Sequence, residues 1–205
     1  FCGCNVQISR SAERRERYLE AVEQELRFIE QTGIQGRAVK QFHWGGGTPT
    51  SLDPDQLERL FGSIMSRFRM AAGAEVSIEV DPRVTTPEQI ERLAALGFNR
   101  ISMGVQDFEP EVQQAIKRVQ SEELTRNIIQ SAREAGMRSV NIDLIYGLPH
   151  QTRDGFKRTV ETTLDIAPER VALFHYAHVP WMKKHQAAMD VDAMPSAEEK
   201  LDLFA

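Results

Sequence analysis

The sequence is short of cysteine, of long apolar runs and of excess positive charge, and each shortage excludes a class of protein. Two cysteines among 205 residues exclude a disulfide-rich secreted scaffold. No apolar run is long enough to span a bilayer, so we expect no membrane-embedded segment. Acidic residues number 30 against 25 basic ones, and the scattered basic residues argue against a nucleic-acid-binding surface. No secretory signal is visible, and we expect a cytoplasmic protein.

What the sequence does contain is an alternation of helical patterns and short apolar runs. Its 41% hydrophobic composition suits one globular domain, which we assign to residues 1–205. Helical spacing from Ser11 to Gln31 is followed by helix-start signatures at Asp53, Thr86 and Ser196. The expected strands are Ala38–Trp44, Glu75–Val80, Arg100–Gly104, Val140–Leu144 and Arg170–His175.

Strands that alternate with helices predict a parallel sheet, because parallel neighbours need a crossover connection between them. Two arrangements satisfy this pattern: an open doubly wound sheet, or a full or partial β/α barrel. The spacing of the elements does not choose between them.

Unusual polar residues lie where the predicted strands end. Glu79, Gln106 and Asp143 fall within or directly after apolar strand runs, and His175-Tyr176-Ala177-His178 closes the last strand. In a parallel β/α fold these ends point to one face, where ligands bind. Turn formation explains Asp81-Pro82 and Gly147-Leu148-Pro149 well, but it explains the first three residues poorly. For the first three residues we expect a shared site.

Three consecutive glycines, Gly45 to Gly47, follow the first predicted strand. A backbone without Cβ atoms can approach a ligand closely, or it can simply make a tight connection. The G-x-G-x-x-G spacing of dinucleotide sites is absent, and no Lys-Ser/Thr follows as in a phosphate-binding loop.

The cysteines, Cys2 and Cys4, are a weak metal signal on their own. Zinc sites usually pair cysteines at wider spacing and use four ligands, and two thiolates do not hold a cubane cluster. His175 and His178 flank a strand end, where a histidine pair is more often structural than metal-binding.

Several segments together resemble the oxygen-independent coproporphyrinogen III oxidases of the radical S-adenosylmethionine (SAM) superfamily. Residues 1–5 (Phe-Cys-Gly-Cys-Asn) resemble the end of that family's cysteine motif, in which three cysteines hold a [4Fe–4S] cluster. The other matching segments are His43–Thr50, Ser77–Pro82, Ser102–Phe108, Asn141–Pro149 and Phe174–His178. The resemblance spans nearly the whole chain.

The resemblance implies an α/β fold, an incomplete (β/α)6 partial barrel of parallel strands. In the family, the first strand immediately precedes the cysteine motif. We therefore expect a truncated fragment, without that first strand, the first two cluster cysteines and the C-terminal region. On that expectation, the chain alone does not assemble an intact cluster and is inactive by itself.

The resemblance also implies an activity and its cofactors. The cluster cleaves SAM to a 5′-deoxyadenosyl radical, and two propionates of coproporphyrinogen III lose carbon dioxide and become the vinyl groups of protoporphyrinogen IX. The implied cofactors are one [4Fe–4S] cluster and two SAM molecules. The implied partners are coproporphyrinogen III, an electron donor and an electron acceptor, and we expect a monomer.

Residue roles follow from the matching motifs. Cys2 is implied as a cluster ligand, Gly46 as a neighbour of the first SAM, and Glu79 as the acceptor of that SAM's ribose hydroxyls. The second SAM is expected to contact Phe1, Gly47, Thr48, Gln106, Arg118, Asp143 and Ala177.

Two alternative functions remain open at this point. Heme-binding chaperones of a related radical SAM group share the glycine-rich and Gly-Leu-Pro segments, although Cys4 and His43-Trp44 favour the oxidase. An unrelated β/α barrel aldolase or isomerase would normally place a catalytic lysine or a divalent-metal cluster at strand ends. No lysine ends any of the five predicted strands.

Overall fold

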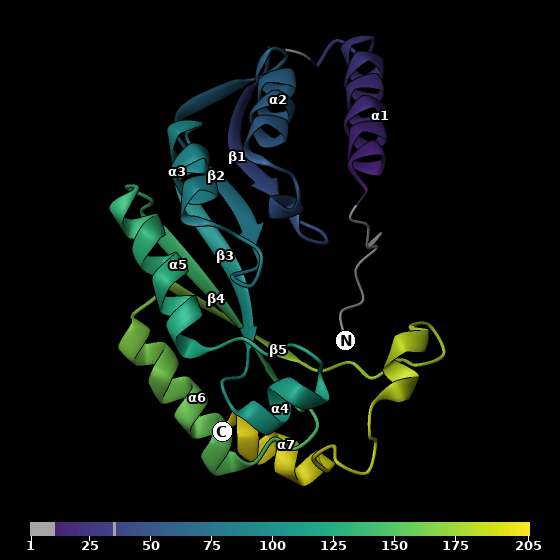
Figure 1. Cartoon of the computed structure of the whole chain (residues 1–205), viewed down its shortest axis with the longest axis vertical. Helices are drawn as coiled ribbons and strands as arrows, with labels where there is room; N and C mark the ends of the chain where they lie inside the picture. The colour runs from purple at the N-terminus through teal and green to yellow at the C-terminus, as the bar shows by residue number, and fades with distance from the viewer. Residues whose placement is uncertain (1–10, 35) are drawn as a thin grey trace. The chain divides into compact units, whose positions relative to one another are not determined.

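The computed structural model describes residues 11–34 and 36–205 and has an α/β fold (Figure 1). Its strands form one five-stranded sheet in the order β1-β2-β3-β4-β5, which is also their order in the chain. The pairs β1–β2 and β4–β5 run parallel. The strands are β1 (Ala38–Trp44), β2 (Arg69–Val80), β3 (Arg100–Gln106), β4 (Ser139–Tyr146) and β5 (Arg170–His175). The predicted α/β class with five parallel strands is confirmed.

Helices connect consecutive strands, as the crossover connections of parallel sheets require. They begin where capping residues allow: the side chains of Asp53, Thr86 and Ser196 each accept a hydrogen bond from the third helical residue, and all three capping boxes are complete. The helices are α1 (Ala12–Glu30), α2 (Pro54–Met65), α3 (Pro87–Ala95), α4 (Pro110–Ala115), α5 (Glu122–Glu134), α6 (Arg153–Ile166) and α7 (Ala197–Phe204), with the 3-10 helices η1 (Pro49–Ser51) and η2 (Lys184–Ala188).

The chain divides into two compact parts, each with its own buried side chains. The first part comprises the described residues up to Ile101 together with Ser131–Arg138, and the second comprises Ser102–Gln130 together with Ser139–Ala205. The first buries Leu19, Leu57, Ile78, Ile90 and Leu93. The second buries Met103, Ile129 and Ile142, and it contains a cluster of Val112, Ile116, Leu148 and Tyr176.

Strand β2 is longer than its sequence pattern indicates. It begins at Arg69, six positions before the predicted start at Glu75, because Ala38 and Val39 of β1 pair with Arg69 and Met70. Residues 69–74 contain no β-branched or aromatic side chain, so only the neighbouring strand reveals them as a strand. Helix α2 correspondingly ends at Met65.

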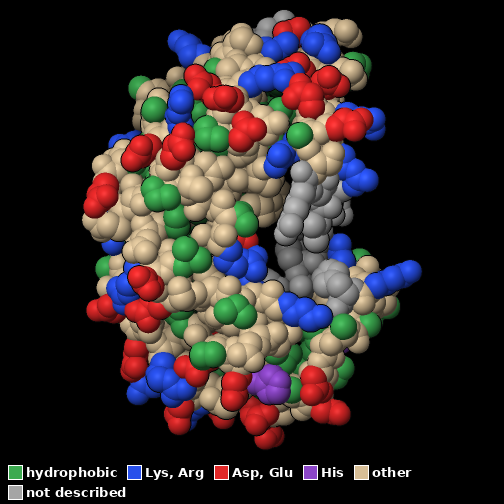
Figure 2. Space-filling view, in the orientation of Figure 1, with side chains coloured by type: hydrophobic (Ala, Val, Ile, Leu, Met, Phe, Trp, Pro, Cys, Tyr) green, Lys and Arg blue, Asp and Glu red, His purple; other side chains and the backbone are tan. Residues whose placement is uncertain are grey.

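The surface carries charges of both signs. On the face drawn in Figure 2, acidic and basic side chains are interspersed and apolar side chains are scattered between them. Among residues 11–34 and 36–205, no helix combines the length and the apolar character needed to cross a bilayer.

Candidate functional site

The glycine loop after β1 lies against a carboxylate from β2. The backbone N–H of Gly46 donates a hydrogen bond to Oε2 of Glu79 at 3.0 Å. Gly46 and Gly47 have φ angles of 82° and 72°, values at which a Cβ is strained. At Gly45 the constraint is space, because a Cβ there would lie 2.6 Å from Nε2 of His43 and 3.0 Å from Cδ of Glu79. The close approach of two side chains therefore favours glycine at Gly45, and the left-handed backbone favours it at the other two.

His43 orients toward the same carboxylate. Its Nε2 lies 3.6 Å from Oε1 of Glu79, and its Nδ1 lies 2.8 Å from Oγ of Ser77. The Ser77 hydroxyl in turn donates to the carbonyl of Phe42 at 3.2 Å. Glu79 thus faces Gly46 with one oxygen and His43 with the other, and its side chain keeps 44% of its surface exposed, which leaves it accessible to a ligand.

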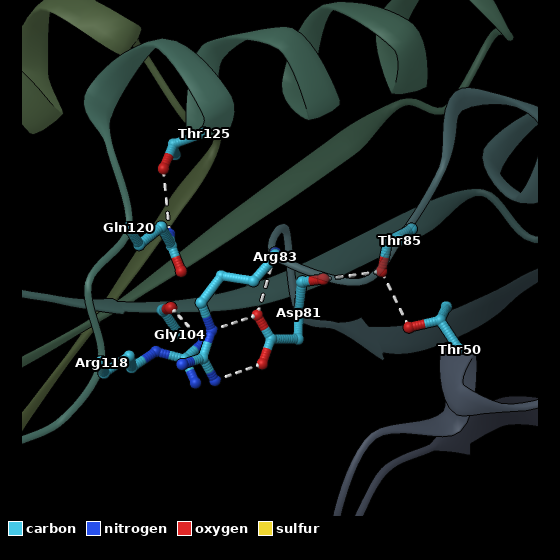
Figure 3. A network of polar contacts seen from close by, with 8 residues as sticks. All are labelled: Thr50, Asp81, Arg83, Thr85, Gly104, Arg118, Gln120 and Thr125. Atoms are coloured by element: carbon cyan, nitrogen blue, oxygen red, sulfur yellow. Dashed lines mark hydrogen bonds and ion pairs between the residues drawn. The ribbon is translucent and has the colours of Figure 1, made fainter. Parts of the chain in front are cut away.

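The loop after β2 is a turn held by Asp81, as one of the two sequence interpretations predicted. The Asp81 carboxylate accepts a hydrogen bond from the backbone N–H of Arg83 at 3.1 Å. It also accepts hydrogen bonds from Nε and Nη2 of the Arg83 guanidinium, at 3.0 and 2.7 Å (Figure 3). These hydrogen bonds raise the pKa of the Arg83 guanidinium. The Asp81 carbonyl accepts a hydrogen bond from the Thr85 hydroxyl at 2.9 Å. Both the side chain and the carbonyl of Asp81 thus form hydrogen bonds within the loop that follows β2.

A buried glutamine fixes the segment after the glycine loop. Nε2 of Gln89 donates to the carbonyls of Thr50 and Leu52, both at 2.9 Å. The hydroxyls of Thr50 and Thr85 lie 2.8 Å apart (Figure 3). Thr48 precedes η1 without capping it through its side chain, so its hydroxyl is not committed to that helix.

In the second part of the molecule, Gln106 and Arg118 both lie against Gly104. Nη2 of Arg118 donates to the Gly104 carbonyl at 2.8 Å (Figure 3), and a Cβ on Gly104 would collide with Nε2 of Gln106. Gln106 is 8% exposed. Its Oε1 is buried and has no hydrogen-bond partner among the described residues, which marks it as an acceptor available to a ligand.

Next along the chain, Asp107 is fully buried and accepts hydrogen bonds from three donors. They are the Thr159 hydroxyl at 2.6 Å, the Gln151 side-chain amide at 2.6 Å and the Glu109 backbone at 2.8 Å. Burial raises the pKa of the Asp107 carboxyl, although these three hydrogen bonds oppose the shift. Because the donors come from three segments, this side chain ties together the loops that follow β3 and β4 and the helix α6.

Asp143 is held by its neighbour on β4. Nδ2 of Asn141 donates to Oδ1 of Asp143 at 2.6 Å and to the Ser102 hydroxyl at 2.8 Å. Residues two apart on a strand share a face, so Asn141 and Asp143 lie on one side of the sheet. The amide thereby orients the carboxylate from the same side.

The backbone at Ala177 is fixed by another buried glutamine. Nε2 of Gln186 donates to the Ala177 carbonyl at 3.2 Å, and its Oε1 accepts from the backbone of Val179 at 2.6 Å. His175 packs its ring 5.1 Å from the ring of Tyr146, which gives it a structural contact.

The predicted site residues are therefore grouped within each part of the molecule. The structure brings Gly46 to Glu79, and it brings Gln106 and Arg118 to Gly104. Phe1, Cys2 and Cys4 lie outside the described residues. Within the described residues, no group of three or more His, Cys, Asp or Glu side chains is arranged to hold a metal ion.

Sequence reasoning missed the buried amides that hold these loops. Gln89, Gln113, Gln151 and Gln186 are all at most 7% exposed. Glutamine is usually a surface residue, so nothing in the chain's pattern distinguishes these four from exposed ones. A signal existed for the buried carboxylate Asp107, because it directly follows the predicted strand end at Gln106.

Comparison with known proteins places the chain in a family. The Radical SAM superfamily model matches residues 1–163. Oxygen-independent coproporphyrinogen III oxidases from Helicobacter pylori J99 and Escherichia coli K12 are each 44% identical to it over 100% of the chain, which covers 45% and 44% of their lengths. The chain thus spans less than half the length of these curated relatives.

Solved structures agree on the fold. The coproporphyrinogen III oxidase of Escherichia coli, a radical SAM enzyme, superposes with a TM-score of 0.94 at 44% identity, covering 99% of this chain and 46% of that one. The Elp3 protein of Methanocaldococcus infernus, at 17% identity and a TM-score of 0.62 over 89% of this chain and 47% of that one, shares the fold. The predicted partial β/α barrel fold of this family is confirmed, and the chain belongs to the radical SAM superfamily.

Proposed function

We propose that this chain is the SAM-binding core of an oxygen-independent coproporphyrinogen III oxidase. That enzyme would decarboxylate two propionates of coproporphyrinogen III to vinyl groups and release protoporphyrinogen IX. The observation that carries the proposal is the 44% identity, over the whole chain, to relatives of that name. No observation favours the alternative of a heme-binding chaperone.

The residues around Glu79 fit the first SAM molecule. Vicinal ribose hydroxyls are donors that suit a half-exposed carboxylate, and the Glu79 oxygens are already oriented by Gly46 and His43. The bare peptide groups of the glycine loop would receive the amino group of SAM at close range. These side chains bind and orient the cofactor, and we assign them no proton transfer.

A second SAM molecule would be bound largely by residues of the other part of the molecule. The buried Oε1 of Gln106 lacks a partner among the described residues, which makes it a suitable acceptor for a donor of that ligand. Arg118 would pair with a carboxylate, for which its planar guanidinium is suited. The proposed contacts to this second molecule are Phe1, Gly47, Thr48, Gln106, Arg118, Asp143 and Ala177.

The [4Fe–4S] cluster would be held by Cys2, which lies outside the described residues, together with the two other cysteines of the family's three-cysteine motif. When bound, the cluster supplies the electron that cleaves SAM reductively. An external electron donor and an electron acceptor are needed to complete the reaction, and we propose that the enzyme works as a cytoplasmic monomer.

The activity is tested with the full-length protein that contains this chain. After anaerobic cluster reconstitution, we expect carbon dioxide release from coproporphyrinogen III in the presence of SAM and a reductant. Tight heme binding without carbon dioxide release would instead support the chaperone.

The binding role of Glu79 is tested by Glu79→Ala in the same protein. Loss of hydrogen bonds to the charged carboxylate should weaken SAM binding by about 1–3 kcal/mol while the iron content stays unchanged. Glu75→Ala is the matched control, because Glu75 lies on the same strand and pairs with Arg100 at 2.8 Å. If Glu79→Ala binds SAM normally and loses iron, the assignment of Glu79 is wrong.

A further inference from the structure

Gln106 occupies a strained turn at the end of β3. The backbone N–H of Asp107 donates to the carbonyl of Val105 at 2.9 Å, and Gln106 between them has φ of 71°. A hydrogen bond from the N–H of residue i+2 to the carbonyl of residue i defines a γ-turn. The form in which the central residue has a positive φ is rare and strained. For a residue with a side chain such a conformation costs on the order of 1–3 kcal/mol and persists only where the surroundings impose it.

The turn places the Gln106 side chain in a confined position. Its amide lies over Gly104, where any side chain would collide with Nε2. The residue is only 8% exposed, and Oε1 is left without a partner among the described residues. The strained backbone of Gln106 and its buried amide oxygen without a hydrogen-bond partner among the described residues each cost free energy in the protein without a ligand. Both features therefore point to a ligand that donates a hydrogen bond to this oxygen.

Asp107 supplies the contacts that hold this turn. Its carboxylate accepts from the Thr159 hydroxyl, from the Gln151 amide and from the backbone of Glu109, at 2.6 to 2.8 Å. Its own carbonyl accepts from Nε2 of Gln113 at 2.9 Å. With its side chain and its carbonyl anchored to other segments, Asp107 cannot rotate to release the residue before it.

We propose that Asp107 is a positioning residue: its buried hydrogen bonds lock Gln106 in the strained turn and thereby aim the Gln106 amide oxygen at a donor group of bound SAM. The proposal rests on the proposed function, in which Gln106 contacts the cofactor. Asp107 itself touches no ligand and acts through Gln106. The free energy that the strained turn costs is thus supplied when the protein folds. The cofactor then binds to an acceptor that is already oriented.

The test is a double-mutant cycle for SAM affinity in the full-length, cluster-reconstituted protein. Asp107→Asn keeps the shape of the side chain, but its amide nitrogen must face a donor, because all three carboxylate partners donate. We expect the SAM dissociation constant to rise on the order of tenfold in the native background and to change little in the Gln106→Ala background. Binding is measured by equilibrium dialysis, which needs no turnover.

A second pair of variants covers the case in which Asp107→Asn does not fold. Thr159→Val removes a hydroxyl that donates to Asp107 and accepts from the backbone of Phe108 at 3.1 Å. Thr163→Val, in the same helix and also buried, removes a hydroxyl that donates to the Thr159 carbonyl at 2.8 Å. We expect Thr159→Val, and not Thr163→Val, to weaken SAM binding, and only when Gln106 is present.

The outcomes separate this proposal from the one on which it rests. If Asp107→Asn loses the same SAM affinity with and without the Gln106→Ala substitution, the positioning role of Asp107 alone is overturned. Unchanged affinity in Gln106→Ala itself would overturn the assignment of Gln106 to the cofactor, and the positioning role with it. Neither result depends on catalytic activity.

Discussion

At the scale of single residues, Gly45 is a glycine because neighbouring side chains leave little space for a Cβ atom. Its backbone lies outside the left-handed region, yet a Cβ would approach His43 Nε2 to 2.6 Å and Glu79 Oε1 to 3.0 Å. A larger residue at this position therefore forces one of its two neighbouring side chains to shift. The next two glycines differ, since their positive φ angles are the constraint.

Gly45→Ala should therefore destabilise the protein by about 1 kcal/mol, the low end of the cost of overpacking, because His43 or Glu79 must move to admit the methyl group and both are half-exposed. Gly62→Ala is the matched control: Gly62 lies within α2, its added methyl would meet nothing within 4 Å, and the change should stabilise by about 0.5–1 kcal/mol. Urea unfolding measures both. Equal effects of the two substitutions would contradict the steric explanation.

The burial of Asp107 predicts how the stability of the folded protein depends on pH. Burial raises the pKa of its carboxyl above 3.8 in the folded protein, while the unfolded chain keeps the ordinary value. The folded state thus binds the proton more tightly, so the contribution of Asp107 to stability is fully present below that ordinary value. It is lost as the pH rises through the higher, folded pKa.

The measurement compares the native protein with Asp107→Asn by urea unfolding from about pH 4 to about pH 7 at constant ionic strength. Other titrating groups cancel in the difference between the two proteins. We expect the unfolding free energy of the native protein, relative to the variant, to fall as the pH rises. A relative stability that rises with pH would mean that the hydrogen bonds outweigh burial.

At the scale of elements, one glutamine couples a helix cap to a distant loop. Oε1 of Gln89 accepts from the Thr86 backbone at 3.0 Å and completes the capping box of α3. Its Nε2 reaches the carbonyls of Thr50 and Leu52 in the segment that follows the glycine loop. The helix start and that segment are therefore held by the same buried amide.

Gln89→Glu separates these two roles, because a carboxylate can still cap the helix but cannot donate. With an acidic group buried against two carbonyl oxygens, we expect a loss of about 3 kcal/mol in unfolding free energy. Gln56→Glu is the control, since Gln56 completes the capping box of α2 through an exposed contact to Asp53 and should change stability by less than about 0.5 kcal/mol. Thermal unfolding of both variants decides whether the donor bonds matter.

At the scale of the whole molecule, the fold is conserved further than the residues that build it. The superposition with the Escherichia coli oxidase reaches a TM-score of 0.94 while only 44% of residues are identical. Cores tolerate substitution when volume and pattern are kept, so a similar backbone does not by itself establish the activity. The function of this chain therefore depends on its site residues, which are the targets of the variants above.

Much of the fold followed from the sequence alone. Capping residues and helical spacing located the starts of α2, α3 and α7, and alternation of strands with helices predicted the parallel sheet. These are local signals, because a cap or a periodic stripe is complete within a few residues. The motifs around Gly46, Glu79, Gln106 and Asp143 likewise pointed to the radical SAM superfamily, since each motif is a short run of neighbouring residues.

Only the tertiary structure decided which polar residues bind one another. The early start of β2 depends on its pairing with β1, and the six-residue helix α4 is too short to leave a periodic pattern. Asp107 meets Gln151 and Thr159 across 44 and 52 positions of sequence. Such partners are chosen by the folded chain, because a buried carboxylate must find donors wherever packing brings them, and no spacing rule in the sequence encodes that choice.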